Sequence, residues 1–158
     1  MENGLHSRRR FITESARLFV VVTSFSMLTC SCGNGQSPQS KTATGIDIQN
    51  GKLVIDINRA PYRALKNIGG GVKLDIESAP KPVIVTRVSA TEVAAFSSQC
   101  THAGYEVLLP EHGVLICESG HGGEFDLRGD VIEGPPKSNL QKYPALLDNY
   151  KVYIDYPL

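Results

Sequence analysis

The sequence predicts an all-β fold, and three observations carry that prediction. Apolar residues in the second half of the chain recur with a period of two, as they do in strands with one buried face. Gly, Pro, Asn and Asp interrupt these runs at short intervals, which is typical of turns between antiparallel strands. No segment after residue 46 shows the 3.6-residue periodicity of a long helix.

Several runs after residue 46 have the length and pattern of strands. They are residues 52–58, 72–76, 82–88, 92–97, 107–109, 114–116, 140–147 and 150–155. Pro110–Gly113 and Asp148–Asn149 separate neighbouring runs at hairpin spacing, so we expect a tight turn at each. The glycines at 69–71 predict a bend between two strands, since no Gly-Lys-Ser/Thr follows to make a phosphate-binding loop.

Composition excludes one class of partner. The 16 Lys and Arg residues balance the 16 Asp and Glu residues, so no net positive charge attracts nucleic acid. Hydrophobic residues make up 41% and charged residues 20%, which is typical of a folded domain. A chain of 158 residues is long enough for one such domain with an appendage. We expect no nucleic-acid partner.

Residues 1–32 have the layout of an export signal. Arg8 and Arg9, followed by Phe11 and Ile12, resemble the twin-arginine pattern, and an uncharged apolar run follows at 18–28. That run is roughly half the length of about 20 apolar residues that a bilayer-spanning helix needs, which favours a signal over an uncleaved anchor. We therefore expect an exported protein, either periplasmic or attached to the outer face of a membrane.

Two cysteines close the signal segment. A lipoprotein processing site places a small residue before a cysteine that becomes lipidated and N-terminal. Cys32, which follows Ser31, fits this pattern better than Cys30, which follows Thr29. We expect a lipid tether at Cys32, with a cleaved soluble protein as the alternative.

The next segment, residues 33–45, is rich in Gly, Ser, Gln and Thr and predicts a flexible linker. The folded domain is then expected at residues 46–158.

Two cysteine–histidine pairs form the most informative pattern of the folded part. Cys100 and His102 enclose one residue, and fourteen residues after His102 a second pair begins, in which Cys117 and His121 enclose three. Two thiolates and two imidazoles suit either an iron-sulfur cluster or structural zinc. Zinc sites usually draw ligands from tight knuckles or a short helix, and none is expected here, so the spacing favours the cluster over the zinc alternative.

The residues around these pairs resemble the Rieske family. Cys-Thr-His-Ala-Gly at 100–104 is similar to the family's first loop, and His-Gly-Gly-Glu-Phe-Asp at 121–126 is similar to its second. The similarity continues through Gly-Pro-Pro at 134–136 to the last strand pair and covers roughly residues 46–158. It implies antiparallel sheets with a cluster-binding subdomain formed by two loops.

The resemblance also implies one Rieske-type 2Fe-2S cluster, with one iron bound by Cys100 and Cys117 and the other by His102 and His121. The expected function is electron transfer, by a small carrier or by the iron-sulfur subunit of an oxidoreductase, with a redox partner protein and no catalysis of its own. The alternative is a degenerate Rieske fold that lacks the cluster and acts as a binding or structural subunit.

One departure from the family concerns the second loop. Family members have two residues between its cysteine and histidine, whereas three separate Cys117 from His121, and Glu118 stands where the cysteine is expected. Either the loop bulges to bring Cys117 to the iron, or the cluster is altered or lost. Retention of the cluster is favoured because both histidines and both glycine-containing loops remain.

Other departures concern the residues around the ligands. Tyr105 stands where quinol-oxidising members have a disulfide cysteine, while Gly123 and Phe125 replace a serine and a tyrosine whose hydroxyls face the cluster. Fewer hydrogen bonds to sulfur lower the reduction potential. We therefore expect a potential toward the low end of the Rieske range of about −150 to about +300 mV.

Overall fold

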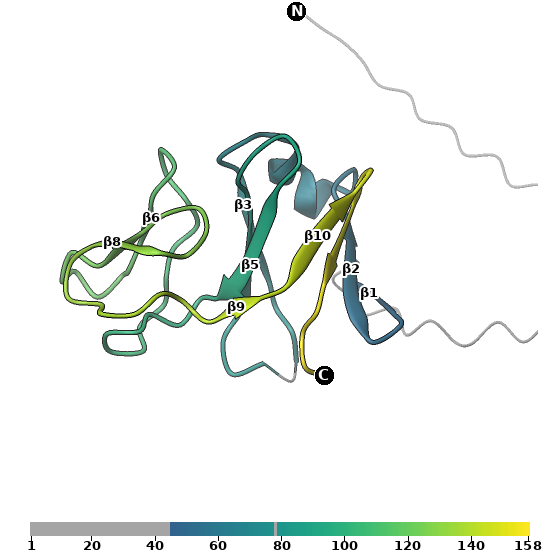
Figure 1. The fold of residues 1–158 in the computed structure, drawn as a ribbon. Helices are drawn as coiled ribbons and strands as arrows, with labels where there is room; N and C mark the ends of the chain where they lie inside the picture. The colour runs from purple at the N-terminus through teal and green to yellow at the C-terminus, as the bar shows by residue number, and fades with distance from the viewer. Residues whose placement is uncertain (1–44, 78) are drawn as a thin grey trace, which may run out of the picture. The chain divides into compact units, whose positions relative to one another are not determined.

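The protein is described by a computed structural model that covers residues 45–77 and 79–158, and this part of the chain confirms the all-β prediction. It contains eleven strands and one short 3-10 helix (Figure 1). The predicted export signal at 1–32 and the linker up to residue 44 lie outside the described residues. No helix in the described ranges is long and apolar enough to cross a membrane.

The strands form three antiparallel sheets. The terminal sheet has the order β1 (Asp47–Gln49), β2 (Lys52–Asp56), β11 (Lys151–Ile154), β10 (Ala145–Asp148). The central sheet has the order β3 (Gly71–Leu74), β4 (Val83–Arg87), β5 (Val93–Ser97), β9 (Lys142–Tyr143). The small sheet has the order β6 (Leu115–Ile116), β7 (Glu124–Phe125), β8 (Val131–Glu133). Figure 1 shows the small sheet at one end of the folded part and β1 and β2 at the other.

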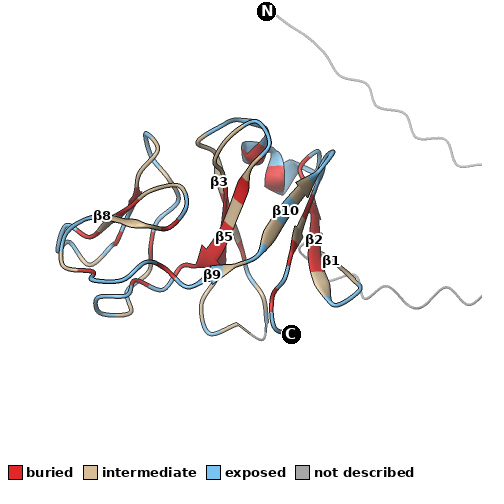
Figure 2. Ribbon diagram, viewed as in Figure 1, coloured by how far each residue is buried: buried red, intermediate tan, exposed pale blue. Residues whose placement is uncertain are grey.

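The terminal and central sheets share one apolar core. Ile55 of β2 and Val152 of β11 belong to the same buried cluster as Val83 and Val85 of β4, and all four side chains are 0% exposed. Figure 2 shows buried residues along β2 and β5. Burying each such side chain contributes roughly 1.5–3 kcal/mol relative to leaving it in water. This core makes the two sheets a sandwich.

The central sheet is buried on its other face as well. Ile84 of β4 and Phe96 of β5 are register partners, and both belong to a second core with Leu115, Phe125 and residues of the loops between them. Because both faces are covered, β4 is a continuous buried run from Val83 to Thr86, where a half-exposed strand would alternate. The second core fixes the small subdomain, residues 98–140, on the back of the sandwich.

The 3-10 helix η1 (Ala60–Lys66) was not predicted from the sequence. Pro61 lies in its first turn. Backbone amides in the first turn of a helix have no acceptor within the helix, so the amide hydrogen that proline lacks costs no helical hydrogen bond. Its two buried side chains, Tyr62 and Leu65, are three residues apart, which matches the 3-10 period. A single three-residue spacing between two apolar residues is too short to be recognised as a helical periodicity in the sequence.

The glycine run was predicted to bend between two strands, and that prediction is wrong. Gly69 and Gly70 connect η1 to β3, and Gly71 is the first residue of β3. A Cβ on Gly70 would lie 1.9 Å from the carbonyl oxygen of Ala64 in η1. The glycine is therefore required by the close approach of two backbones.

Both predicted hairpin turns exist, and one is displaced. Glu111 and Val114 exchange backbone hydrogen bonds of 2.9 and 3.0 Å, which confirms the turn at Pro110–Gly113. The last turn lies one residue later than predicted, because β10 includes Asp148 and the loop is formed by Asn149 and Tyr150. Asn149 has a φ of 55°, a left-handed conformation that asparagine tolerates better than most residues.

Two further strand predictions need correction, and three strands were not predicted. Residues 107–109 form no strand, and Val107 makes only an isolated bridge to Cys117. The run 140–147 divides into β9 and β10 around Pro144, which lacks a donor for a continuous ladder. The strands β1, β7 and β8 were missed because each has only two or three residues.

Candidate metal centre

The four predicted ligands lie on two loops of the small subdomain. Cys100 and His102 lie on the first loop, which directly follows β5. Cys117 and His121 lie on the second loop, between β6 and β7. The bridge between Val107 and Cys117 brings the end of one loop alongside the start of the other. The fold thus brings together two segments that fourteen residues separate in the sequence.

Backbone hydrogen bonds close each loop. In the first loop, Cys100 donates to the carbonyl of Tyr105 at 2.8 Å, and Gly104 donates to the carbonyl of Cys100 at 2.9 Å. In the second loop, Cys117 donates to the carbonyl of Gly123 at 2.9 Å. Each cysteine is therefore fixed by its own backbone at the base of a loop.

The two cysteines form a buried pair. Cys100 and Cys117 are each 2% exposed, neither is in a disulfide, and both belong to the second core. Burial raises the pKa of the Cys100 thiol, and its hydrogen bond to Cys117 raises that pKa further. Burial also acts to raise the pKa of Cys117, but hydrogen bonds with Cys100 and Ser119 outweigh it and lower that pKa overall. The pKa of one thiol is thus raised and that of the other lowered, so Cys117 is the member of the pair whose thiolate is favoured.

The two histidines form an exposed pair. The rings of His102 and His121 meet edge to face, with centroids 5.4 Å apart and planes at 70°. Both residues are exposed to solvent. The site therefore has a buried sulfur side and an exposed imidazole side.

The donor set of this arrangement matches that of a two-iron group with mixed ligation. Tetrahedral zinc requires four ligands to converge on one point. Within residues 45–77 and 79–158, no group of three or more His, Cys, Asp and Glu side chains is placed to hold one metal ion. A two-iron cluster with mixed ligation instead needs a cysteine pair and a histidine pair, and those are the donor pairs that the two loops bring together.

Glu118 faces a different environment from its neighbour Cys117. It is exposed, and its carboxylate accepts a hydrogen bond from the backbone of Glu106 at 3.4 Å. Its own amide donates to the carbonyl of Glu106 at 3.0 Å. The second loop therefore directs Cys117, and not Glu118, toward Cys100.

The segment of residues 134–138, which contains two prolines and is called the proline-containing segment below, packs against the second loop. A Cβ on Gly134 would lie 2.1 Å from the carbonyl oxygen of Gly122, and a Cβ on Gly123 would lie 3.0 Å from Cγ of Pro136. Pro136 and Gly123 are both buried. A serine at position 123 would therefore need Pro136 to shift by a few tenths of an ångström, so this position is tight for any side chain.

Sequence reasoning missed two hydroxyl side chains of these loops. Thr101, between the first ligand pair, donates to the carbonyl of Ser138 at 2.6 Å and so ties the first loop to the proline-containing segment. Ser119, between the second pair, lies with its Oγ 3.3 Å from the sulfur of Cys117. Their position between ligands was the available signal, but their contacts depend on loop geometry.

Polar contacts also hold the small subdomain on the sandwich. Arg128 makes two hydrogen bonds to the carboxylate of Glu92, at 3.0 and 2.8 Å. Thr86, which is fully buried, donates to the carbonyl of Leu127 at 2.5 Å. Lys73 of β3 and Glu106 form an ion pair. These contacts fix the orientation of the loops relative to the central sheet.

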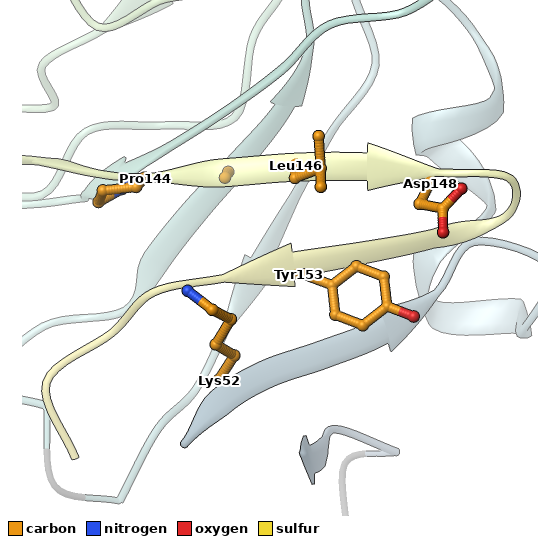
Figure 3. A pocket seen from close by; sticks show the side chains of 6 residues that line it. Lys52, Pro144, Leu146, Asp148 and Tyr153 are labelled. Atoms are coloured by element: carbon orange, nitrogen blue, oxygen red, sulfur yellow. The ribbon is translucent and has the colours of Figure 1, made fainter. Parts of the chain in front are cut away.

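A groove of about 400 Å³ lies elsewhere, on the outer face of the terminal sheet (Figure 3). Leu146 of β10 and Tyr153 of β11 are register partners that border it. They alternate along their strands with Leu147 and Val152, which face the sandwich core. No cysteine or histidine lines this groove, so it is separate from the metal centre.

Comparison with known families identifies the class of protein. The sequence profile of the Rieske 2Fe-2S domain matches residues 59–144, which is more than half of the chain and includes all four predicted ligands. The chain belongs to the Rieske family, and the resemblance inferred from the two loops is confirmed. The cofactor of this family is a single 2Fe-2S cluster.

Individual relatives agree with this assignment. The chain is 33% identical over 75 residues to a protein of Haloferax mediterranei named as the Rieske subunit of a respiratory nitrate reductase. That match covers 46% of this chain and 34% of the relative, so the chain matches about a third of the relative's length.

Solved structures share the fold. The plasma membrane Rieske protein of the cyanobacterium Synechocystis PCC 6803 is 26% identical, with a TM-score of 0.50 over 60% of this chain and 93% of that chain. A quaternary ammonium Rieske monooxygenase matches at 17% identity with a TM-score of 0.50, over 59% of this chain and 28% of that chain. Electron transfer is the general function that these similarities support.

Proposed function

We propose that this chain transfers electrons through one 2Fe-2S cluster bound by Cys100, His102, Cys117 and His121. The observation that carries the proposal is the buried cysteine pair beside the exposed histidine pair, on two adjoining loops. When bound, such a cluster supplies a one-electron redox couple.

The protein's residues have distinct tasks in this proposal. Cys100 and Cys117 would bind one iron from within the apolar second core, where both side chains are buried. His102 and His121 would bind the other iron, and because both are exposed to solvent, their rings would be the groups that a partner protein can approach. Neutral imidazoles in place of thiolates reduce the negative charge of the site and favour reduction.

The displaced cysteine is a ligand in this proposal. Burial of Cys117 beside Cys100 supports that assignment, and so does the contact of the Glu118 carboxylate with the Glu106 backbone. The extra residue of the loop is then absorbed between Cys117 and His121.

The proposed redox partner is another protein. A small carrier that exchanges electrons with a donor and an acceptor agrees with the exposed histidines. A subunit role in a larger oxidoreductase is the second candidate, because the Haloferax mediterranei relative is named as a Rieske subunit of a nitrate reductase. Copurification of the full chain from its native membranes separates the two, since a subunit retains stoichiometric partners and a carrier does not.

The first test is electron paramagnetic resonance of the dithionite-reduced, full-length chain, together with iron and sulfide analysis. We expect two irons and two sulfides per chain and a rhombic spectrum with nitrogen couplings from two histidines. The His121→Ala variant should lose the cluster. A folded wild-type chain that binds no iron and sulfide under reconstitution would refute the proposal and favour the cluster-free alternative.

We also propose that residues 1–32 export the folded domain, residues 46–158, across the cytoplasmic membrane, and that Cys32 is lipidated. The twin-arginine pattern at Arg8 and Arg9 supports this, since that route carries folded proteins and a cluster is assembled before export. The test is cell fractionation. Cys32→Ala should release the protein from membranes while Cys30→Ala leaves it bound, and equal behaviour of the two variants would contradict a tether at Cys32.

A further inference from the structure

We propose that Ser119 is a positioning residue that tunes the reduction potential of the site, through a hydrogen bond from its hydroxyl to the iron-bound sulfur of Cys117. This inference rests on the proposed function, because the potential is a property of the loaded protein. It goes further by assigning a role to a residue that is not itself a ligand.

The contact that carries the inference lies inside the second loop. The Oγ of Ser119 is 3.3 Å from Sγ of Cys117, which is hydrogen-bonding distance for sulfur. The same oxygen accepts a hydrogen bond from the backbone amide of His121 at 3.4 Å. Ser119 therefore bridges the side chain of one predicted ligand and the backbone of another.

The balance of protons then fixes the direction of the bond to sulfur. In the structure the Cys117 thiol donates and Ser119 accepts. A cysteine that binds iron has lost its proton and can only accept. A hydroxyl has one proton to donate, and Ser119 already accepts from the His121 amide. Its own proton is then available for the sulfur of Cys117, which lies 3.3 Å away.

Such a bond favours the reduced state. A hydrogen bond to an anionic acceptor is stronger than one to a neutral acceptor. Reduction adds negative charge to the group that the sulfur binds, so the bond strengthens when the electron arrives. Hydrogen bonds to the sulfurs are among the factors that set the potential of iron-sulfur proteins.

The role depends on the unusual length of this loop. Ser119 is the middle one of the three residues between Cys117 and His121. The hydroxyl positions that the Rieske resemblance implies on the far side of His121 are filled by Gly123 and Phe125, and Gly123 has Pro136 against it. The loop thus offers a sulfur-directed hydroxyl before the histidine and none at these two positions after it.

The test compares Ser119→Ala with wild type in the full-length, reconstituted chain. Midpoint potentials are measured by redox titration followed by electron paramagnetic resonance, and iron content is measured on the same samples. We expect Ser119→Ala to keep its iron and to titrate at a lower potential, so that at the wild-type midpoint less than half of it is reduced. Ser138→Ala, a change at an exposed serine whose carbonyl and not its hydroxyl is hydrogen-bonded, should titrate as wild type.

The outcomes separate this inference from the proposed function. A cluster in Ser119→Ala that titrates at or above the wild-type potential would overturn the inference and leave the proposed function intact. A wild-type chain without a cluster would overturn the proposed function. If Ser119→Ala does not retain iron, Ser119→Thr and Ser119→Val decide the matter, because they have similar shapes and only threonine keeps the hydroxyl. Equal potentials in that pair would refute the hydrogen bond.

Discussion

Cys117 and Glu118 are neighbours in the chain, yet their side chains lie in opposite environments. Cys117 is 2% exposed and interacts with Cys100, whereas Glu118 is in solvent with its carboxylate on the backbone of Glu106. The Rieske pattern aligns Glu118 with the ligand position, so sequence spacing alone leaves the choice open. Burial and chemistry both favour the thiol, because a thiolate is the ligand that iron-sulfur clusters use.

The residue-scale prediction follows from that difference. Cys117→Ala should abolish cluster binding, because one iron loses half of its protein ligands. Glu118→Ala should retain the full iron content, since it removes only a weak, exposed contact with the Glu106 backbone. The cluster content of both variants is measured as iron and sulfide per chain after identical reconstitution. An iron-free Glu118→Ala variant beside an iron-loaded Cys117→Ala variant would show that the loop does not bulge as described.

At this scale the sequence was informative wherever a residue type has few uses. Cysteine and histidine pairs on two loops are rare enough that Cys100, His102, Cys117 and His121 could be predicted as ligands from residue type and arrangement, although the spacing of the second pair departs from that of the family. The serine between the second pair could not, because serine is common and its role depends on a 3.3 Å contact that the loop conformation creates.

At the scale of elements, the proline-containing segment covers the second loop of the metal centre through a close contact at Gly134. Gly134 has a φ of 91°, and a Cβ there would lie 2.1 Å from the carbonyl oxygen of Gly122. Gly113, at the tip of the hairpin between the two loops, has a φ of 84°, but a Cβ added there would have no atom within 4 Å. The two positions share a left-handed backbone and differ in crowding.

We therefore predict that Gly134→Ala weakens the cover and Gly113→Ala does not. Both variants should lose about 1–2 kcal/mol in the free energy of unfolding, from a left-handed backbone with a Cβ. Gly134→Ala should lose more than Gly113→Ala, because its Cβ would also collide with the backbone of Gly122. Only Gly134→Ala should also separate the proline-containing segment from the second loop, and its cluster should be lost severalfold faster to a chelator. The decay of the visible absorbance measures this. Equal decay in the two variants would mean that the segment does not protect the site.

The elements that could be predicted are those long enough to show a pattern. The runs that became β2, β4, β5 and β11 were identified from apolar patterns of strand length, whereas β7 and β8 have two and three residues and no pattern to detect. The glycines at 69–71 were misread because their requirement comes from the backbone of η1, which is close in space. Contacts between elements decide such positions, and one sequence does not show them.

At the scale of the whole molecule, the central sheet joins the sandwich to the site. Its β4 strand presents Val83 and Val85 to the sandwich core and Ile84 to the second core, which contains both cysteines. The unbroken apolar run of β4 was visible in the sequence, but its burial on two faces was not deduced from it. A perturbation of either core is transmitted through the same strands, so we expect one cooperative unfolding transition.

A matched pair of isoleucines tests how local the support of the site is. Ile84 and Ile55 are both 0% exposed, and they lie in the second core and the sandwich core respectively. Each Ile→Val change removes one buried methylene and should lower the free energy of unfolding by about 1 kcal/mol. Denaturation in urea, followed by circular dichroism, should show similar shifts in midpoint for the two variants.

The two variants should nevertheless differ at the metal centre. Ile84→Val loosens packing in the core that holds Cys100 and Cys117, so its cluster should be lost to a chelator faster than that of wild type. Ile55→Val leaves that core unchanged and should lose its cluster at the wild-type rate under native conditions. If Ile55→Val loses its cluster as fast as Ile84→Val, cluster release follows global unfolding, and the second core gives the site no local protection.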